Sequence, residues 1–129
     1  MLAGANLRQA YLTAVNLSGA DLHEADLEGA ILSWADLSRA NLEDTDLNGA
    51  DLNNADLSRT NLRGADMGRA NLSEANLHGA DLESAALDGT DLSGANLDEA
   101  SLNGTNLNPE QLAQAASRKG ATMPDGTKN

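Results

Sequence analysis

The residues best suited to chemistry are two histidines and an excess of carboxylates. His23 and His78 stand alone, and neither has a second histidine at the spacing of a zinc site. The chain contains no cysteine. It also has no Ser-His-Asp arrangement, no phosphate-binding glycine loop and no residue spacing typical of an EF-hand calcium-binding loop. The sequence therefore predicts no catalytic, cofactor-binding or metal-binding residue, and a protein that is not an enzyme.

Composition restricts the kind of protein further. The 129 residues carry a formal net charge of −12 and only 2% aromatic residues. Such acidity disfavours direct contact with nucleic acid or membranes and favours a basic protein partner. No apolar run approaches the ~20 residues of a membrane span. The absence of cysteine fits a reducing compartment, so we expect a cytoplasmic protein of one domain without a cofactor.

A period of five residues organises almost the whole chain. Leucine occupies every fifth position from Leu2 to Leu112, with Met67 as the exception. The position two residues earlier is alanine in most repeats, and the position between them is usually Asp or Asn. The exceptions at the alanine position are also small: Val15, Thr45, Thr60, Thr90 and Thr105.

This period is incompatible with a single regular element. On an α-helix, a five-residue step rotates each leucine by ~140°, so the leucines would spiral around the axis. On a continuous strand, an odd step would place successive leucines on opposite faces. The pattern is satisfied only if the chain bends once per repeat, which predicts an all-β solenoid. The small residue and the leucine then point inward, and the intervening Asp or Asn points outward.

The repeats resemble those of the pentapeptide-repeat family, which is abundant in cyanobacteria. The likeness covers residues 2–109 without interruption. It implies a right-handed, four-sided β-helix of about five coils. The period itself leaves the number of sides open, because Glu43, Arg63 and Glu83 recur every twenty residues, whereas threonines and several glycines recur every fifteen.

The two ends of the repeat array differ. Residues 1–108 are expected to form the β-helix, and residues 109–120 a short capping α-helix. Asn108 and Pro109 favour a helix start, and Gly120 favours its end. Residues 121–129 are expected to be a turn-rich or frayed tail. The first coil has no comparable cap, so we expect a monomer or a weak homodimer formed through this end.

Two surface features are candidate partner-binding sites. The four-sided register stacks acidic residues into columns, and regular columns of this kind could imitate a nucleic-acid backbone. The columns consist of Asp26, Asp46 and Asp66 on one face, and Asp36 and Asp56 on another. Local bonding of each side chain at its turn is the simpler interpretation, and the stacked Arg39 and Arg59 interrupt the negative surface.

The second feature is a break in the repeat pattern. Tyr11 and Ile31 replace the outward Asp or Asn, and Trp34 occupies the adjoining corner. Exposed apolar clusters often mark protein contacts. The leading hypothesis is therefore a non-catalytic protein-interaction or scaffold module. The alternative, which the family resemblance permits, is a DNA mimic that modulates a type II topoisomerase such as gyrase.

Overall fold

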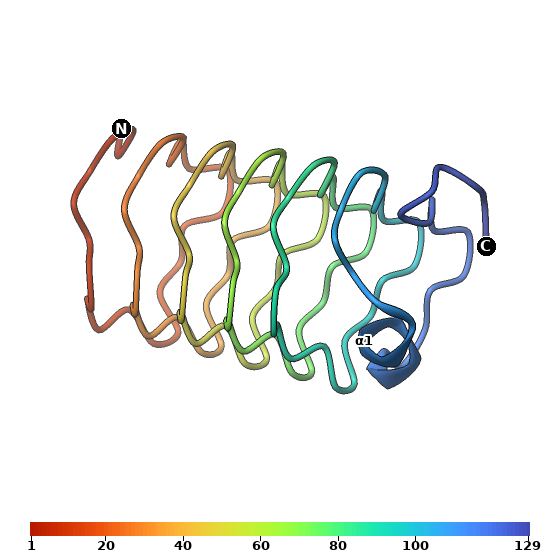
Figure 1. Cartoon of the computed structure of the whole chain (residues 1–129). Helices are drawn as coiled ribbons and strands as arrows, with labels where there is room; N and C mark the ends of the chain where they lie inside the picture. Colours follow the sequence, from red (N-terminus) through yellow and green to blue (C-terminus); the bar gives the residue numbers. More distant parts are fainter.

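The computed structural model describes residues 1–129 as a stack of flat coils wound around one axis, with the two chain ends at opposite ends of the stack (Figure 1). Parallel backbone pairing joins positions twenty residues apart, from Asn6 with Asp26 to Asp81 with Ser101. Since each repeat has five residues, a coil of twenty has four sides. The fifteen-residue recurrence of the threonines is therefore not the coil period.

Two sets of hydrogen bonds hold each coil to the next. The Leu27 amide donates to the Asp46 carbonyl at 2.7 Å, and the Asp46 amide donates back to the Ala25 carbonyl at 3.0 Å. Equivalent bonds recur on all four sides. Each extended piece is so short that only its outward Asp or Asn forms a complete pairing, and the chain then turns.

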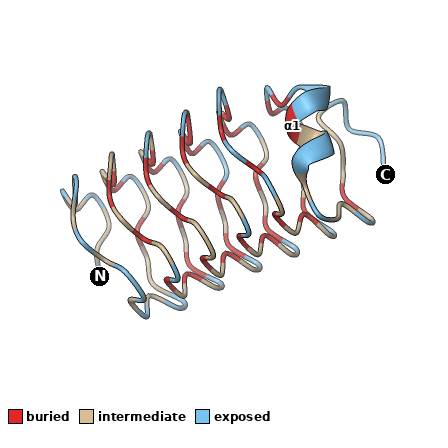
Figure 2. Ribbon diagram, turned by 90° about the horizontal axis from the view of Figure 1, so that it is seen from below, coloured by how far each residue is buried: buried red, intermediate tan, exposed pale blue.

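The inward residues fill the axis completely. From Leu22 to Leu102 every leucine position is at most 1% exposed, and Met67 fits the same position. Figure 2 shows this buried interior running through the stack, while the first coil is only partly covered. Each buried leucine contributes about 1.5–3 kcal/mol, so the repeated ladder supplies the driving force that aromatic residues provide in other cores.

The buried threonines keep their hydroxyl groups bonded. Thr45 Oγ1 donates to the Leu22 carbonyl at 3.0 Å, and Thr90 Oγ1 donates to the Met67 carbonyl at 2.8 Å. No buried side-chain polar atom lacks a partner. The threonines therefore fit the narrow interior, and Thr45, Thr60 and Thr90 add a hydrogen bond between coils.

The corners determine which residues follow each leucine. The amide after the corner bonds back to the leucine carbonyl, as Ala30 does to Leu27 at 3.0 Å. The second corner residue has positive φ, +68° at Gly49 and +61° at Trp34. The third residue of a type II turn needs this conformation, which explains why glycine is frequent there.

One helix, α1, spans Pro109–Gln114 and lies at the C-terminal end of the stack (Figure 1). Asn108 caps it, and Gln111 completes a capping box. The Gln111 side-chain amide also donates to the carbonyls of Leu87 (2.7 Å) and Thr90 (3.2 Å) in the last regular coil. No helix in the structure is both long enough and apolar enough to cross a lipid bilayer.

The helix is shorter than the expected residues 109–120, because the chain returns to the solenoid. The Ala116 amide donates to Ala95, and the carbonyls of Ser117 and Lys119 accept from Leu97 and Glu99. These coil groups would otherwise lack partners, so their pairing outweighs the local helix propensity.

The last residues are turn-rich, which is one of the two forms expected for them, and they pair with the solenoid. Thr122 pairs in parallel with Ser101 and antiparallel with Lys128, and Ala121 is fully buried. The turn between Met123 and Thr127 folds the end of the chain back on itself, with the Met123 amide donating to the Thr127 carbonyl at 2.6 Å. The tail thus covers part of the final coil.

The corner geometry predicts a position-specific cost for side chains. At Gly49 an added Cβ would meet nothing within 4 Å, so Gly49→Ala introduces backbone strain alone. We expect it to lower the free energy of unfolding by about 1 kcal/mol, measured by urea denaturation. The control is Ser58→Ala, at a first corner position without positive φ, which should change stability far less. Equal effects of the two substitutions would contradict this account of the corners.

Candidate functional site

The three residues that break the repeat pattern lie together on the surface. Tyr11 and Ile31 pair directly across the first two coils, and Trp34 is at the corner after Ile31. Tyr11 is 86% and Trp34 65% exposed, and Ile31 is half-buried. We call Tyr11, Ile31 and Trp34 the apolar patch. Asp51 continues the column beyond Ile31, so the patch borders a carboxylate.

The acidic columns form as the four-sided register predicts. Asp26 pairs with Asp46 and Asp46 with Asp66, while Asp36 pairs with Asp56 on another face. Every one of these carboxylates accepts a hydrogen bond from the amide two residues later, at 2.9–3.1 Å. The aspartate at the outward position of the repeat therefore has a local role, because its side chain stabilises the turn that follows it.

Two arginines bridge neighbouring coils in the same way. Arg8 Nη1 lies 3.2 Å from Asp26 Oδ2 and 2.6 Å from Glu28 Oε2. Arg63 makes the same pair of contacts with Asp81 and Glu83. Both sets are solvent-exposed, so they contribute little to stability. Hydrogen bonding from the Glu28 amide, and then from Arg8, lowers the pKa of the Asp26 carboxyl.

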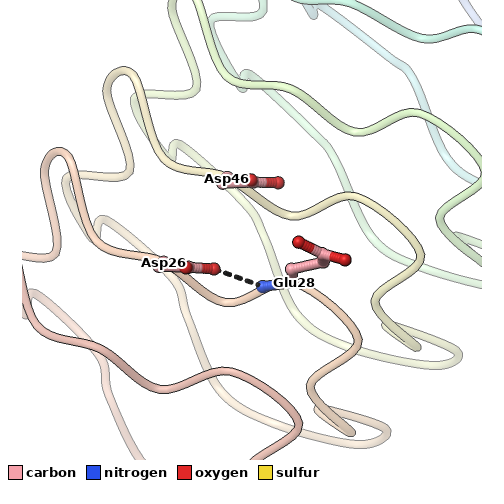
Figure 3. A group of neighbouring side chains, drawn as sticks. All are labelled: Asp26, Glu28 and Asp46. Carbon is pink, nitrogen blue, oxygen red and sulfur yellow. Dashed lines mark hydrogen bonds between the residues drawn. The ribbon is translucent and has the colours of Figure 1, made fainter.

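Asp26, Glu28 and Asp46 are the one set of neighbouring carboxylates close enough to share a cation. Their ligand atoms lie within 4.8 Å of one another, and Figure 3 shows the two aspartates on successive coils with Asp26 bonded to the Glu28 amide. All three are only partly buried. Arg8 already contacts two of the three carboxylates and neutralises charge where an ion would bind.

The structure does not bring the two histidines together. They are fifty-five residues apart, which is not a multiple of the twenty-residue coil, so they occupy different corners. His23 Nδ1 lies 2.8 Å from Asp21 Oδ1, and this hydrogen bond raises the pKa of His23. His78 Nε2 lies 3.8 Å from Glu99 Oε2. Each histidine has a carboxylate neighbour of its own.

A polar groove, with a volume of about 530 Å³, crosses several coils on the face of the Asp36 column. We call it the Arg39–Arg59 groove, and it contains no hydrophobic residue. Its lining is Ser38, Arg39, Asp56, Ser58, Arg59, Asn76, His78 and Asn96. The stacking of Arg39 on Arg59 follows from the sequence, but the groove was not predicted from it. The available signal was the column of short residues, Ser38 and Ser58, beside the long arginines.

The chain belongs to the pentapeptide-repeat family. Eight copies of the family's repeat match residues 2–33, 35–73 and 75–108, which is most of the chain. Membership implies that the coils form a right-handed β-helix and confirms the resemblance inferred from the repeats.

Solved structures agree with this assignment. The pentapeptide-repeat protein Rfr23 from the cyanobacterium Cyanothece 51142 is 40% identical with a TM-score of 0.62. The match covers 78% of this chain and 65% of Rfr23, so this chain spans less than two thirds of that protein's length. No curated protein sequence matches.

Two further solved structures are more distant. HetL, involved in heterocyst differentiation regulation in the cyanobacterium Nostoc sp. strain PCC 7120, is 31% identical, with 98% of this chain and 78% of HetL covered and a TM-score of 0.38. QnrB1, a plasmid-mediated fluoroquinolone resistance protein, is 16% identical, with 94% and 61% covered and a TM-score of 0.46. Similarities this distant do not indicate a function for this chain.

The bonding of Asp36 predicts a dependence of stability on pH. Ser38 donates to Asp36 Oδ1 from its hydroxyl (2.6 Å) and its amide (3.0 Å), and these bonds lower the pKa of this carboxyl. A folded pKa below the unfolded value gives stabilisation that is complete above about pH 4 and is lost as the pH falls through the folded pKa. Asn71 accepts the same two bonds from Ser73. An asparagine at position 36 can therefore keep both hydrogen bonds while removing the negative charge.

We therefore expect Asp36→Asn to lower the urea midpoint slightly at about pH 7, and the difference from the unsubstituted protein to shrink progressively as the pH falls below about 4. Asp36→Ala, which removes the acceptor, should have a larger effect at about pH 7. Ser38→Ala serves as a control, since it removes the hydroxyl donor and should weaken the pH dependence. A difference between the unsubstituted protein and the Asp36→Asn variant that does not vary with pH would show that the charge has no role.

Proposed function

We propose that this chain is a non-catalytic protein-interaction module whose contact surface is the apolar patch. The observation that carries the proposal is the exposure of Tyr11 (86%), which pairs with Ile31, and of Trp34 (65%), at the corner after Ile31. Aromatic residues are enriched at the centres of protein interfaces because they bury much area with little loss of side-chain entropy. The repeat does not need them, since Asp or Asn follows Tyr11 and Ile31 in the later coils of their column, and small or polar residues occupy the positions equivalent to Trp34.

The distribution of polar groups supports a non-catalytic role. Catalysis depends on several groups converging where water is excluded. Here the interior is filled by leucine, alanine and threonine. The two histidines lie on different corners and have side chains that are 42% and 38% exposed.

Charge favours a particular class of partner. The net charge of −12 attracts basic surfaces over long range. Asp51 pairs with Ile31 at the edge of the patch, so a partner with an apolar centre and a basic rim would match it. The partner we propose is therefore a basic protein.

The acidic columns have a local explanation, and we do not propose DNA mimicry on their account. The amide bonds to Asp46 and Asp66 support a turn-stabilising role. Arg8 bridges the same column at Asp26, and Arg39 and Arg59 interrupt the negative charge beside the other column.

Weak association of two copies through the first coil is a second form of the proposed interaction. The amides of Asn6, Tyr11 and Asn16 have no hydrogen-bond partner in the structure, and the leucines of this coil are only partly covered. Tyr11 belongs both to this edge and to the apolar patch. Self-association and partner binding would therefore share a residue.

The patch is tested by Tyr11→Asp, Ile31→Asp and Trp34→Ser made together. Because all three side chains point outward, we expect an unchanged circular dichroism spectrum and cooperative unfolding. Partner recovery from extract of the native cell, quantified by mass spectrometry, should fall at least about tenfold. Self-association, measured by sedimentation, should fall with it.

The matched control replaces Asn71, Asp91 and Glu74 by serine, at equivalent positions of later coils that do not border the patch. This control should retain partner recovery. The proposal fails if the folded patch variant recovers the same partners undiminished, or if the control loses them to the same extent.

A further inference from the structure

Arg39 and Arg59 differ from the other arginines of the solenoid because their guanidinium groups are unpaired. Arg8 and Arg63 contact carboxylates, and Arg69 donates to Asn48 at 2.9 Å. Arg39 and Arg59 make no ion pair or side-chain hydrogen bond, and both are exposed. They are stacked on successive coils, about 4.8 Å apart. Two adjacent unpaired cations are unexpected in a chain with a net charge of −12.

The part of this column from Arg39 to Glu99 carries opposite charges at its two ends. Arg39, Arg59, Gly79 and Glu99 follow one another at twenty-residue intervals. Gly79 leaves room for the Arg59 side chain, since a Cβ there would meet Arg59 Cγ at 3.4 Å. Glu99, whose side chain is 71% exposed, lies 3.8 Å from His78 at the far end of the groove. Along the axis, two positive residues are therefore followed by a glycine and then by a negative residue.

The groove between these charges offers mostly hydrogen-bond donors. The Ser58 hydroxyl has no partner and can donate, and Asn96 and Asn76 form an amide ladder with Asp56. The Asp56 carboxylate already accepts from the Ser58 amide and from Asn76. A ligand would thus present an anionic group to the arginines and a carbonyl oxygen to the Ser58 hydroxyl.

We propose that the Arg39–Arg59 groove binds an extended polypeptide segment that has an acidic residue and a basic residue four positions apart. The distance from the arginine pair to Glu99 is about two and a half coils, or roughly 12 Å along the axis. Four residues of extended chain cover about 13 Å and place both side chains on the same face. A carboxylate accepts paired N–H groups from arginine, and the basic residue reaches Glu99.

A polypeptide fits these charges better than a phosphate polymer. Glu99 at one end and Asp56 within the groove would repel a uniformly negative ligand, and so would the net charge of the chain. A mixed-charge segment avoids this repulsion. The groove is a surface separate from the apolar patch. Failure of the peptide-binding proposal would therefore leave the partner-binding proposal for the patch unaffected, and the reverse also holds.

The test uses the full chain and a fluorescently labelled heptapeptide, Ser-Glu-Thr-Val-Thr-Lys-Ser, with blocked ends. Binding is measured by fluorescence anisotropy at low salt. We expect saturable binding that weakens as salt rises, because exposed charges are screened. The reversed sequence is included to cover the opposite chain direction. A permuted peptide with adjacent Glu and Lys has the same composition and should bind at least about tenfold more weakly than the better of the two.

Two variants of the protein complete the test. Arg39→Gln with Arg59→Gln should weaken binding at least about tenfold, whereas Arg69→Gln, the same substitution at an equivalent corner on another face, should leave it within about twofold. Glu99→Lys should invert the preference, so that a peptide with Glu at both positions binds more tightly than the original.

Equal binding of the permuted peptide, equal loss in the Arg69→Gln control, or no inversion by Glu99→Lys would overturn the proposal. So would the absence of binding at about millimolar peptide, or competition by inorganic phosphate or duplex DNA as strong as that by unlabelled peptide.

Discussion

Parallel backbone pairing between successive coils is the interaction on which the rest of this molecule depends. It joins positions twenty residues apart, and it turns a five-residue period into four straight sides. Leucines that would spiral on a helix or alternate on a strand then converge on one axis. Burial of these leucines follows from the pairing, and the corners with positive φ make the pairing possible because they turn the chain after each short side.

This arrangement separates stability from surface identity. Inward positions hold leucine, methionine, alanine, valine or threonine, because the narrow interior is packed. Outward positions need only satisfy the turn, which Asp and Asn do by bonding the amide two residues later. Tyr11 and Ile31 give up that bond, and Trp34 adopts a conformation that disfavours a large side chain. These departures are informative because the fold does not require them.

The period alone predicts the coil interior, and with the family resemblance it predicts the four sides. Residues twenty positions apart then lie in the same column, so the pairing of Tyr11 with Ile31 and the stacking of Asp26 on Asp46 could both be predicted. The ends could not. Residues 115–120 have helix-forming character, yet unpaired coil groups at Ala95 and Leu97 draw them into another partial coil. The groove also depends on how far the arginine side chains extend, which a repeat pattern does not specify.

Cysteine pairs provide the most direct measurement of the register, because the chain has no cysteine of its own. Asn41 and Asn61 pair on successive coils, about 4.8 Å apart, within the range that a disulfide spans. Asn41→Cys with Asn61→Cys should therefore form an intramolecular disulfide under mild oxidation, whereas Asn41→Cys with Asp56→Cys should not. Formation of the second disulfide in place of the first would indicate a fifteen-residue coil and contradict the four-sided fold.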